Sequence, residues 1–191
     1  MTAQGCERIG FDVLTDYAAG ELAQAEAAAI EEHLFSCADC GGRAEEFDAL
    51  VGVIPEAVRS AEVGGFVTDA VLNRLARDGV RVRAYALSLG AVVPCAVWDD
   101  DELMALRMRG DFGDASELTL SQRIDGREVI RATGEIAGAS RGEIIYALPA
   151  AWVRELPNVK VEVLLTAHEA GREREVGSYT LLHEGSLRRP I

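Results

Sequence analysis

The sequence lacks any long apolar run. Its longest stretch without a charged residue, from Ala84 to Trp98, has 15 residues and is interrupted by Gly90 and Pro94. Because a membrane-spanning helix needs about 20 consecutive apolar residues, we expect no membrane insertion. The hydrophobic and charged fractions, 49% and 27%, are typical of a soluble globular protein, and 191 residues allow one or two domains.

Basic residues are also scarce. Lysine and arginine number 19 against 32 aspartates and glutamates, which gives a net charge of −13. This balance disfavours direct binding to nucleic acid or to an anionic membrane surface. Residues 1–60 hold twelve acids and three arginines, a net of −9, whereas residues 61–191 hold twenty acids and sixteen bases, a net of −4. An acidic N-terminal module suits a basic protein partner, although solvated helix faces would have the same composition.

Cysteine and histidine are rare, yet three of them lie within eight residues, as His33, Cys37 and Cys40. His33 and Cys37 are four residues apart and would share one face at the end of a helix, and two residues separate the cysteines. Zinc prefers such nitrogen and sulfur ligands in a tetrahedron, and closed sites with three cysteines and one histidine are usually structural. Cys6, 27 residues before His33, is the candidate fourth ligand. The alternative is a metal-free helical core that merely contains these residues.

The surrounding sequence resembles a known family. The stretch from Leu14 to Leu22 contains a Gly-Glu-Leu turn and precedes a helix rich in alanine and glutamate that ends in Glu-His-Leu, followed by the two cysteines. This pattern is similar to the N-terminal domain of zinc-binding anti-sigma factors, which inhibit extracytoplasmic-function sigma factors in bacteria. The resemblance covers residues 1–78 and implies an upstream zinc ligand near Cys6. It also implies that the helices bind between the two DNA-binding regions of a sigma factor.

Helical periodicity extends over the same region. We predict helices near residues 11–19, 23–35, 39–53 and 68–77, with Gly20 ending the first and Pro55 following the third. Three short helices bury little surface, so a zinc ion would stabilise them.

The fourth helix follows a loop that contains Gly64 and Gly65, so we predict a tethered amphipathic arm. Its apolar residues Val67, Val71 and Leu75 are the predicted partner-binding residues. The alternative is that this helix packs on its own C-terminal domain, because amphipathicity alone does not choose between the two surfaces.

From residue 79 to residue 191 the periodicity changes to that of strands. Alternating side chains, as in Val159 to Val163, and the Asp125-Gly126 turn between two such runs predict an antiparallel β-sandwich or open barrel. Residues 150–156 fit a short helical turn. The predicted fold class is therefore α+β with two domains, 1–78 helical and 79–191 β-rich.

The β-rich part shows no pattern typical of catalysis. We interpret the acidic run from Asp99 to Glu102 as a solvated turn, since hard cations need many converging oxygen ligands. His168 and His183 fall on separate predicted strands. We interpret Cys95 as a buried, inert thiol. No nucleophile–base pair or glycine-rich phosphate loop can be argued, so we do not expect an enzyme. An unknown ligand or protein could bind the β domain.

Together these patterns predict a cytoplasmic anti-sigma factor with a zinc-binding helical head and a β-rich sensor or docking domain. The compartment follows from cysteines that are placed as metal ligands and from the lack of a secretory leader. Three alternatives remain: a zinc-stabilised adaptor for a non-sigma protein, a redox sensor that releases its partner when the zinc thiolates are oxidised, and a metal-dependent enzyme that uses the β domain.

Overall fold

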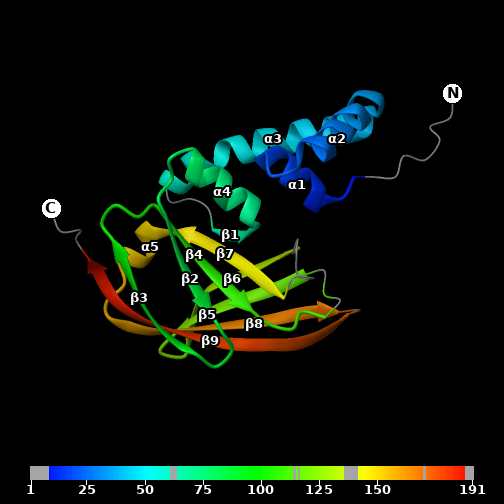
Figure 1. Cartoon of the computed structure of the whole chain (residues 1–191). Coiled ribbons are helices and arrows are strands. Elements are labelled where there is room, and N and C mark those ends of the chain that lie inside the picture. Colours follow the sequence, from blue (N-terminus) through cyan, green and yellow to red (C-terminus); the bar gives the residue numbers. More distant parts are fainter. Residues whose placement is uncertain are drawn as a thin grey trace.

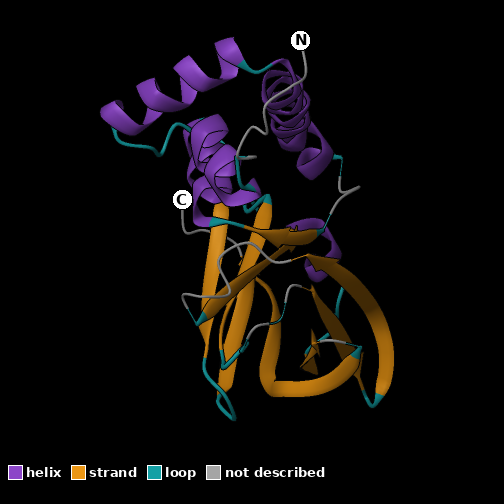
Figure 2. Cartoon of the chain, turned by 90° about the vertical axis from the view of Figure 1, so that its right-hand side faces the viewer, coloured by secondary structure: helices purple, strands orange, loops and turns teal. Residues whose placement is uncertain are grey.

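The computed structural model describes residues 9–60, 64–113, 115, 117–135, 142–169 and 171–187. Among these residues, four helices lie on one side of two packed β-sheets (Figures 1 and 2). These helices are α1 (Phe11–Ala19), α2 (Gln24–Ser36), α3 (Ala38–Arg59) and α4 (Asp69–Arg77), and a short α5 (Ala150–Arg154) lies among the strands.

The helix ends follow local sequence signals. Gly20 ends α1 in the left-handed conformation, at φ 72°, as predicted. The carboxylate of Glu26 accepts a hydrogen bond from the backbone N–H of Ala23 at 3.3 Å and so caps the start of α2. Thr68 caps α4, because its Oγ1 accepts a hydrogen bond from the backbone N–H of Val71. The fourth predicted helix is thereby confirmed as an element.

The predicted end of the third helix near residue 53, ahead of Pro55, is wrong, because α3 continues to Arg59. Proline removes one backbone hydrogen bond inside a helix. Here Ile54 and Val58 pack into an apolar cluster between the helices and a sheet. Beyond them the guanidinium Nε of Arg59 lies 3.3 Å from a carboxylate oxygen of Glu102. Tertiary contacts therefore hold the last turn together.

The strands form two open sheets. The four-stranded sheet has the order β1 (Gly65–Val67), β7 (Glu143–Pro149), β4 (Leu103–Arg109) and β2 (Val82–Leu87). The five-stranded sheet has the order β3 (Val92–Trp98), β9 (Arg172–Leu187), β8 (Val159–Glu169), β5 (Glu117–Ile124) and β6 (Arg127–Glu135). The α+β class is confirmed, and the described strands do not close into a barrel.

The prediction of a wholly antiparallel sheet domain is wrong for two pairs of strands. β2 pairs with β4, and β3 pairs with β9, in parallel. Side chains alternate in the same way in both kinds of pairing, so the sequence pattern does not distinguish them. The short connection 88–91 carries the chain from one sheet to the other. By contrast, Asp125 and Gly126 both have positive φ and join β5 to β6 in the predicted hairpin.

The main hydrophobic core lies between the two sheets. Met104, Leu106 and Tyr146 of the four-stranded sheet face Leu120, Val163 and other residues of the five-stranded sheet.

The acidic run from Asp99 to Glu102 is not simply a solvated turn as predicted. Asp101 is buried, pairs with the guanidinium of Arg83 and accepts a hydrogen bond from the backbone N–H of Trp98 at 2.9 Å.

A second core covers the other face of the four-stranded sheet. Val71, Leu72 and Leu75 of α4 pack there with Val58 of α3. The sheet presents small side chains beneath the helix, where Ala105 of β4 pairs directly with Ala147 of β7. Small residues let the helix approach the strands closely, and both faces of these strands are consequently buried.

This packing determines where the predicted partner-binding residues lie. Val71 and Leu75 are buried between α4 and the four-stranded sheet, and Val67 of β1 packs against the same cluster. The structure therefore shows the alternative arrangement, in which the fourth helix packs on the β-rich part of its own chain. Their role in binding a partner stays a prediction, and it would require α4 to leave the sheet.

Ion pairs and hydrogen bonds fix α4 at both ends. At its start, Asp69 pairs with Arg107 of β4, whose guanidinium also lies 2.7 Å from the carboxylate of Glu143. At its end, Arg74 donates a hydrogen bond to the carbonyl oxygen of Ala18 at 3.1 Å, and Arg77 lies 2.6 Å from the carboxylate of Glu21. α4 thus connects the helices of the N-terminal part to the sheets.

We predict that the stability of the fold declines as the pH falls below about 6.5 because of His183, which is buried in β9. Burial lowers the pKa of His183, with a backbone hydrogen bond at Leu156 acting in the opposite direction. Below the ordinary pKa of histidine, near 6.5, the unfolded chain takes up a proton that the folded chain binds only at lower pH. Protonation therefore favours unfolding as the pH falls from that value towards the folded pKa.

Urea unfolding at pH 7.5 and pH 5.5 measures this effect. The loss of stability between the two pH values should be smaller in His183→Leu than in the native chain. Equal losses in both proteins would show that His183 does not contribute.

Candidate metal centre

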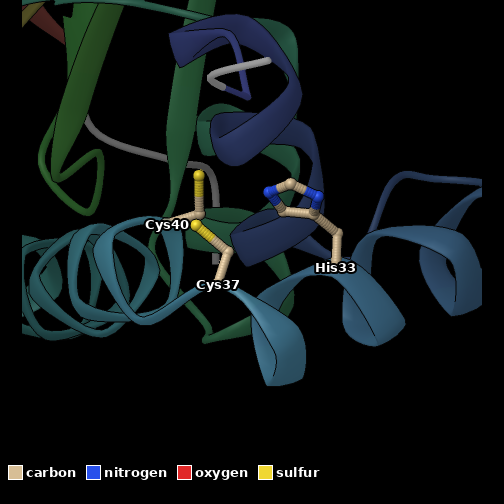
Figure 3. Close-up of side chains that lie close together, drawn as sticks. All are labelled: His33, Cys37 and Cys40. Carbon is tan, nitrogen blue, oxygen red and sulfur yellow. The ribbon is translucent and has the colours of Figure 1, made fainter. Parts of the chain in front are cut away.

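His33, Cys37 and Cys40 come together at the junction of two helices. His33 lies in the last turn of α2, Cys40 lies in the first turn of α3, and Cys37 stands between the helices in an extended conformation. The backbone N–H of Cys37 donates to the carbonyl of His33 at 2.9 Å, and its own carbonyl accepts from Gly41 at 2.9 Å. One extended residue therefore redirects the chain, and the imidazole points towards both sulfurs (Figure 3).

The geometry fits a single metal ion. One ligand atom from each of the three residues lies within 4.8 Å of the others. Ligands of a tetrahedral zinc ion at about 2.0–2.3 Å from the metal stand roughly 3.5–3.8 Å apart, so small side-chain rotations would complete the site. Cys40 is 0% exposed, while His33 and Cys37 are half-buried. One imidazole and two sulfurs are a donor set that suits zinc.

The predicted fourth ligand, Cys6, lies outside the described residues. The described chain begins close to the site, since Arg43 donates a hydrogen bond from its guanidinium to the carbonyl oxygen of Ile9 at 3.2 Å. Arg43 is three residues beyond Cys40 on α3, which places it on the same side of that helix. In the sequence, Cys6 is three positions before Ile9. The assignment of Cys6 stays a prediction.

The helices around the site have a small apolar core. Leu14, Ala19, Cys40 and Val51 are buried, but none of the residues of α2 is. Apolar burial therefore holds α2 only weakly to its neighbours. A metal ion bound by His33 of α2 and Cys40 of α3 would join the two helices directly, which gives the site a structural purpose.

A groove of about 890 Å³ lies between α1, α2 and α3. Apolar side chains such as Leu34 and Phe35 line it together with the acidic residues Glu31, Glu45 and Asp48. Burial, followed by the negative charges of Glu31 and Asp48, raises the pKa of Tyr17, whose phenol lines the same groove. The groove thus combines apolar surface with negative charge.

Three exposed apolar residues of α2 and α3 were not predicted from the sequence. Phe35 is 92% exposed, and Leu50 and Val53 of α3 are 57% and 60% exposed. The signal was present, because Leu50 and Val53 are apolar yet lie off the helical stripe that contains Cys40 and Val51. Large exposed apolar side chains are often found in protein-binding surfaces.

Comparison with known proteins supports the metal centre. Residues 12–41 match a protein family described as "Putative zinc-finger", and this segment contains His33, Cys37 and Cys40. Residues 12–41 are therefore similar to a zinc finger of a kind typical of anti-sigma factors. The zinc-finger assignment made from the His-x3-Cys-x2-Cys spacing is confirmed.

The other comparisons add little. Among solved structures, the N-terminal domain of phage TP901-1 ORF48 is similar over 55% of this chain and 99% of its own length, with 13% sequence identity and a TM-score of 0.37. We infer nothing from so distant a likeness. No curated protein matches the chain.

Within the described residues, every helix is too short or too polar to cross a lipid bilayer.

Proposed function

We propose that this chain is an anti-sigma factor whose helical domain binds and inhibits an extracytoplasmic-function sigma factor in the cytoplasm. The observation that carries the proposal is the cluster of His33, Cys37 and Cys40 within a zinc-finger segment typical of anti-sigma factors. In this proposal zinc has a structural role, because it joins α2 to α3 and so shapes the groove. In this proposal the chain acts by binding a protein and not as an enzyme.

The charge and shape of the groove support a protein partner. Its acidic residues suit the basic surfaces with which a sigma factor contacts promoter DNA. The exposed side chain of Phe35 offers an apolar anchor of the kind that dominates binding energy at protein interfaces. A sigma factor bound here would be kept from polymerase and promoter, and transcription would resume when a signal weakens the complex.

α4 has a separate place in this proposal. The four-stranded sheet covers Val71 and Leu75 of α4, and Val67 of β1 packs in the same cluster. A sigma factor could contact these residues only if α4 left the sheet. A helix with two alternative surfaces provides the two states that a regulated inhibitor needs. In one state α4 lies on its own sheet, and in the other it contributes to the complex.

We predict that Phe35→Asp weakens sigma-factor binding by at least about tenfold, because loss of an aromatic anchor typically costs more than about 1.4 kcal/mol. The side chain is almost fully exposed, so the fold and the zinc content should not change. Leu89→Asp is the matched control, since Leu89 is a 53% exposed apolar residue of the β-rich part. Titration calorimetry with extracytoplasmic-function sigma factors of the same organism measures both affinities.

Three outcomes of this experiment are informative. A complex of the native chain that is weakened by Phe35→Asp and not by Leu89→Asp supports the proposal. Absence of any complex contradicts the anti-sigma assignment and favours an adaptor for a different protein. A complex that is insensitive to Phe35→Asp contradicts the assignment of the groove as the binding surface.

A further inference from the structure

The β-sandwich contains a cavity of about 440 Å³ that the zinc-finger domain does not explain. It lies between the two sheets next to α5, where Met104 and Leu148 of the four-stranded sheet face Val161 and Leu181 of the five-stranded sheet. Its volume falls within the range of roughly 300–1,000 Å³ that is typical of small-molecule pockets. No charged side chain lines it in the described part of the chain.

Two polar side chains line this cavity. They occupy inward-facing strand positions, which are usually apolar in a β-sandwich. Gln122 follows Leu120 on the inner face of β5, and His183 follows Leu181 on the inner face of β9. Gln122 is 6% exposed and His183 is 2% exposed. A buried polar group costs free energy unless it forms a hydrogen bond, so their presence in this core calls for a partner.

Within the described structure, one of the two ring nitrogens of His183 lacks a well-formed hydrogen bond. Its Nε2 is buried and forms no hydrogen bond of ordinary geometry, although the backbone of Leu156 lies close enough to oppose the fall in the pKa of the ring. Its Nδ1 lies 3.9 Å from the sulfur of Cys95, which also lines the cavity. Burial raises the pKa of Cys95 to about 11, so the thiol keeps its proton and can donate it to Nδ1. With the thiol as the donor to Nδ1, the neutral imidazole holds its own hydrogen on Nε2 and can donate it to a ligand.

The cavity has a route to solvent. Val129 of β6 and Trp152 of α5 line it and remain 50% and 37% exposed. These two residues form a partly open rim, while His183 and Gln122 lie in the buried interior. An apolar molecule could therefore enter between β6 and α5 and place a polar atom near the imidazole.

We propose that this cavity binds a small, uncharged and mainly apolar molecule that carries a hydrogen-bond acceptor, such as a carbonyl or ether oxygen. The acceptor would receive the hydrogen of His183 Nε2, and the amide of Gln122 offers a second donor and an acceptor. A charged ligand is disfavoured, because the lining provides no counter-charge for a buried ion. This site does not depend on the proposed anti-sigma function.

The position of the site suits a sensor. Met104 and Leu148 line the cavity from one face of the four-stranded sheet, and their chain neighbours Ala105 and Ala147 support α4 on the other face. The same two strands thus contact the bound molecule on one side and the helix that joins the two parts of the protein on the other.

The fluorescent ketone prodan tests the proposal, because it is uncharged, apolar and carries a single carbonyl acceptor. We expect the full chain to bind one prodan with a blue-shifted emission. Ile124→Trp, which fills the cavity from β5, should weaken binding at least tenfold. His183→Leu should weaken binding several-fold and shift the emission further to the blue, because the carbonyl loses its hydrogen bond. Circular dichroism confirms that each variant is folded.

Phe35→Asp is the control for binding in the groove between the helices, and it should bind prodan like the native chain. No saturable binding, binding that Ile124→Trp leaves unchanged, or binding that Phe35→Asp abolishes would each overturn the proposal. If His183→Leu does not fold, Ile124→Trp together with Phe35→Asp still decides the matter. Loss of sigma-factor binding has no bearing on these outcomes, since the titration uses the chain alone.

Discussion

Cys40→Ser is expected to remove the bound metal and to release α2 from α3. A serine hydroxyl is a poor zinc ligand, and even changes to groups around the direct ligands of a metal cost about 10–100-fold in affinity. Structural zinc contributes about 10–16 kcal/mol of apparent binding free energy in zinc-finger peptides. Since no residue of α2 is buried, little apolar packing compensates for that loss. We expect zinc per chain to fall at least tenfold, with a partial loss of helical circular dichroism.

Cys95→Ser is the matched control for this prediction. Cys95 is also a buried cysteine, but it lies in the β-sandwich. Its replacement should leave the zinc content unchanged, as measured by mass spectrometry of the metal after exhaustive dialysis. Equal zinc contents in Cys40→Ser and the native chain would rule out Cys40 as a ligand.

Leu75→Ala is expected to destabilise the fold by about 2–5 kcal/mol, the usual cost of removing a fully buried leucine side chain. Leu75 is 1% exposed and packs in the second core above Ala105 and Ala147. The small alanines leave few side-chain atoms that could move to fill the space, so the cavity should persist. Because α4 joins the helices to the sheets, the loss should affect the contact between the two parts most.

Leu50→Ala provides the comparison, since the exposed Leu50 of α3 has little packing to lose. Its effect should remain within about 0.5 kcal/mol, as for most surface substitutions. Urea unfolding followed by circular dichroism measures both changes. Similar effects of the two substitutions would mean that α4 does not depend on its sheet for stability, and would favour the tethered arm predicted from the sequence.

The parts of the structure that depend on local sequence could be predicted. The metal cluster needs only one helix–turn–helix, because His33, Cys37 and Cys40 lie within eight residues. The helices, the Gly20 cap and the Asp125-Gly126 hairpin follow for the same reason. Each depends on spacing or on backbone preference over a few residues.

Features that depend on distant contacts could not be predicted in this way. The parallel pairing of β3 with β9 joins segments about ninety residues apart. The continuation of α3 beyond Pro55 depends on packing of Val58 against a sheet formed later in the chain. The amphipathic pattern of α4 predicted a buried face without indicating which surface buries it. The inward-facing His183 and Gln122 line one cavity only because the packing of their two strands brings them together.

Zinc K-edge X-ray absorption of the purified full chain tests the central claim most directly. We predict one zinc per chain with sulfur ligands at about 2.3 Å and an imidazole nitrogen at about 2.0–2.1 Å. Three sulfurs would establish Cys6 beside Cys37 and Cys40, whereas two would assign the fourth position to another ligand. A chain that retains no zinc, or a first shell of only nitrogen and oxygen, would contradict the zinc centre on which the proposed function depends.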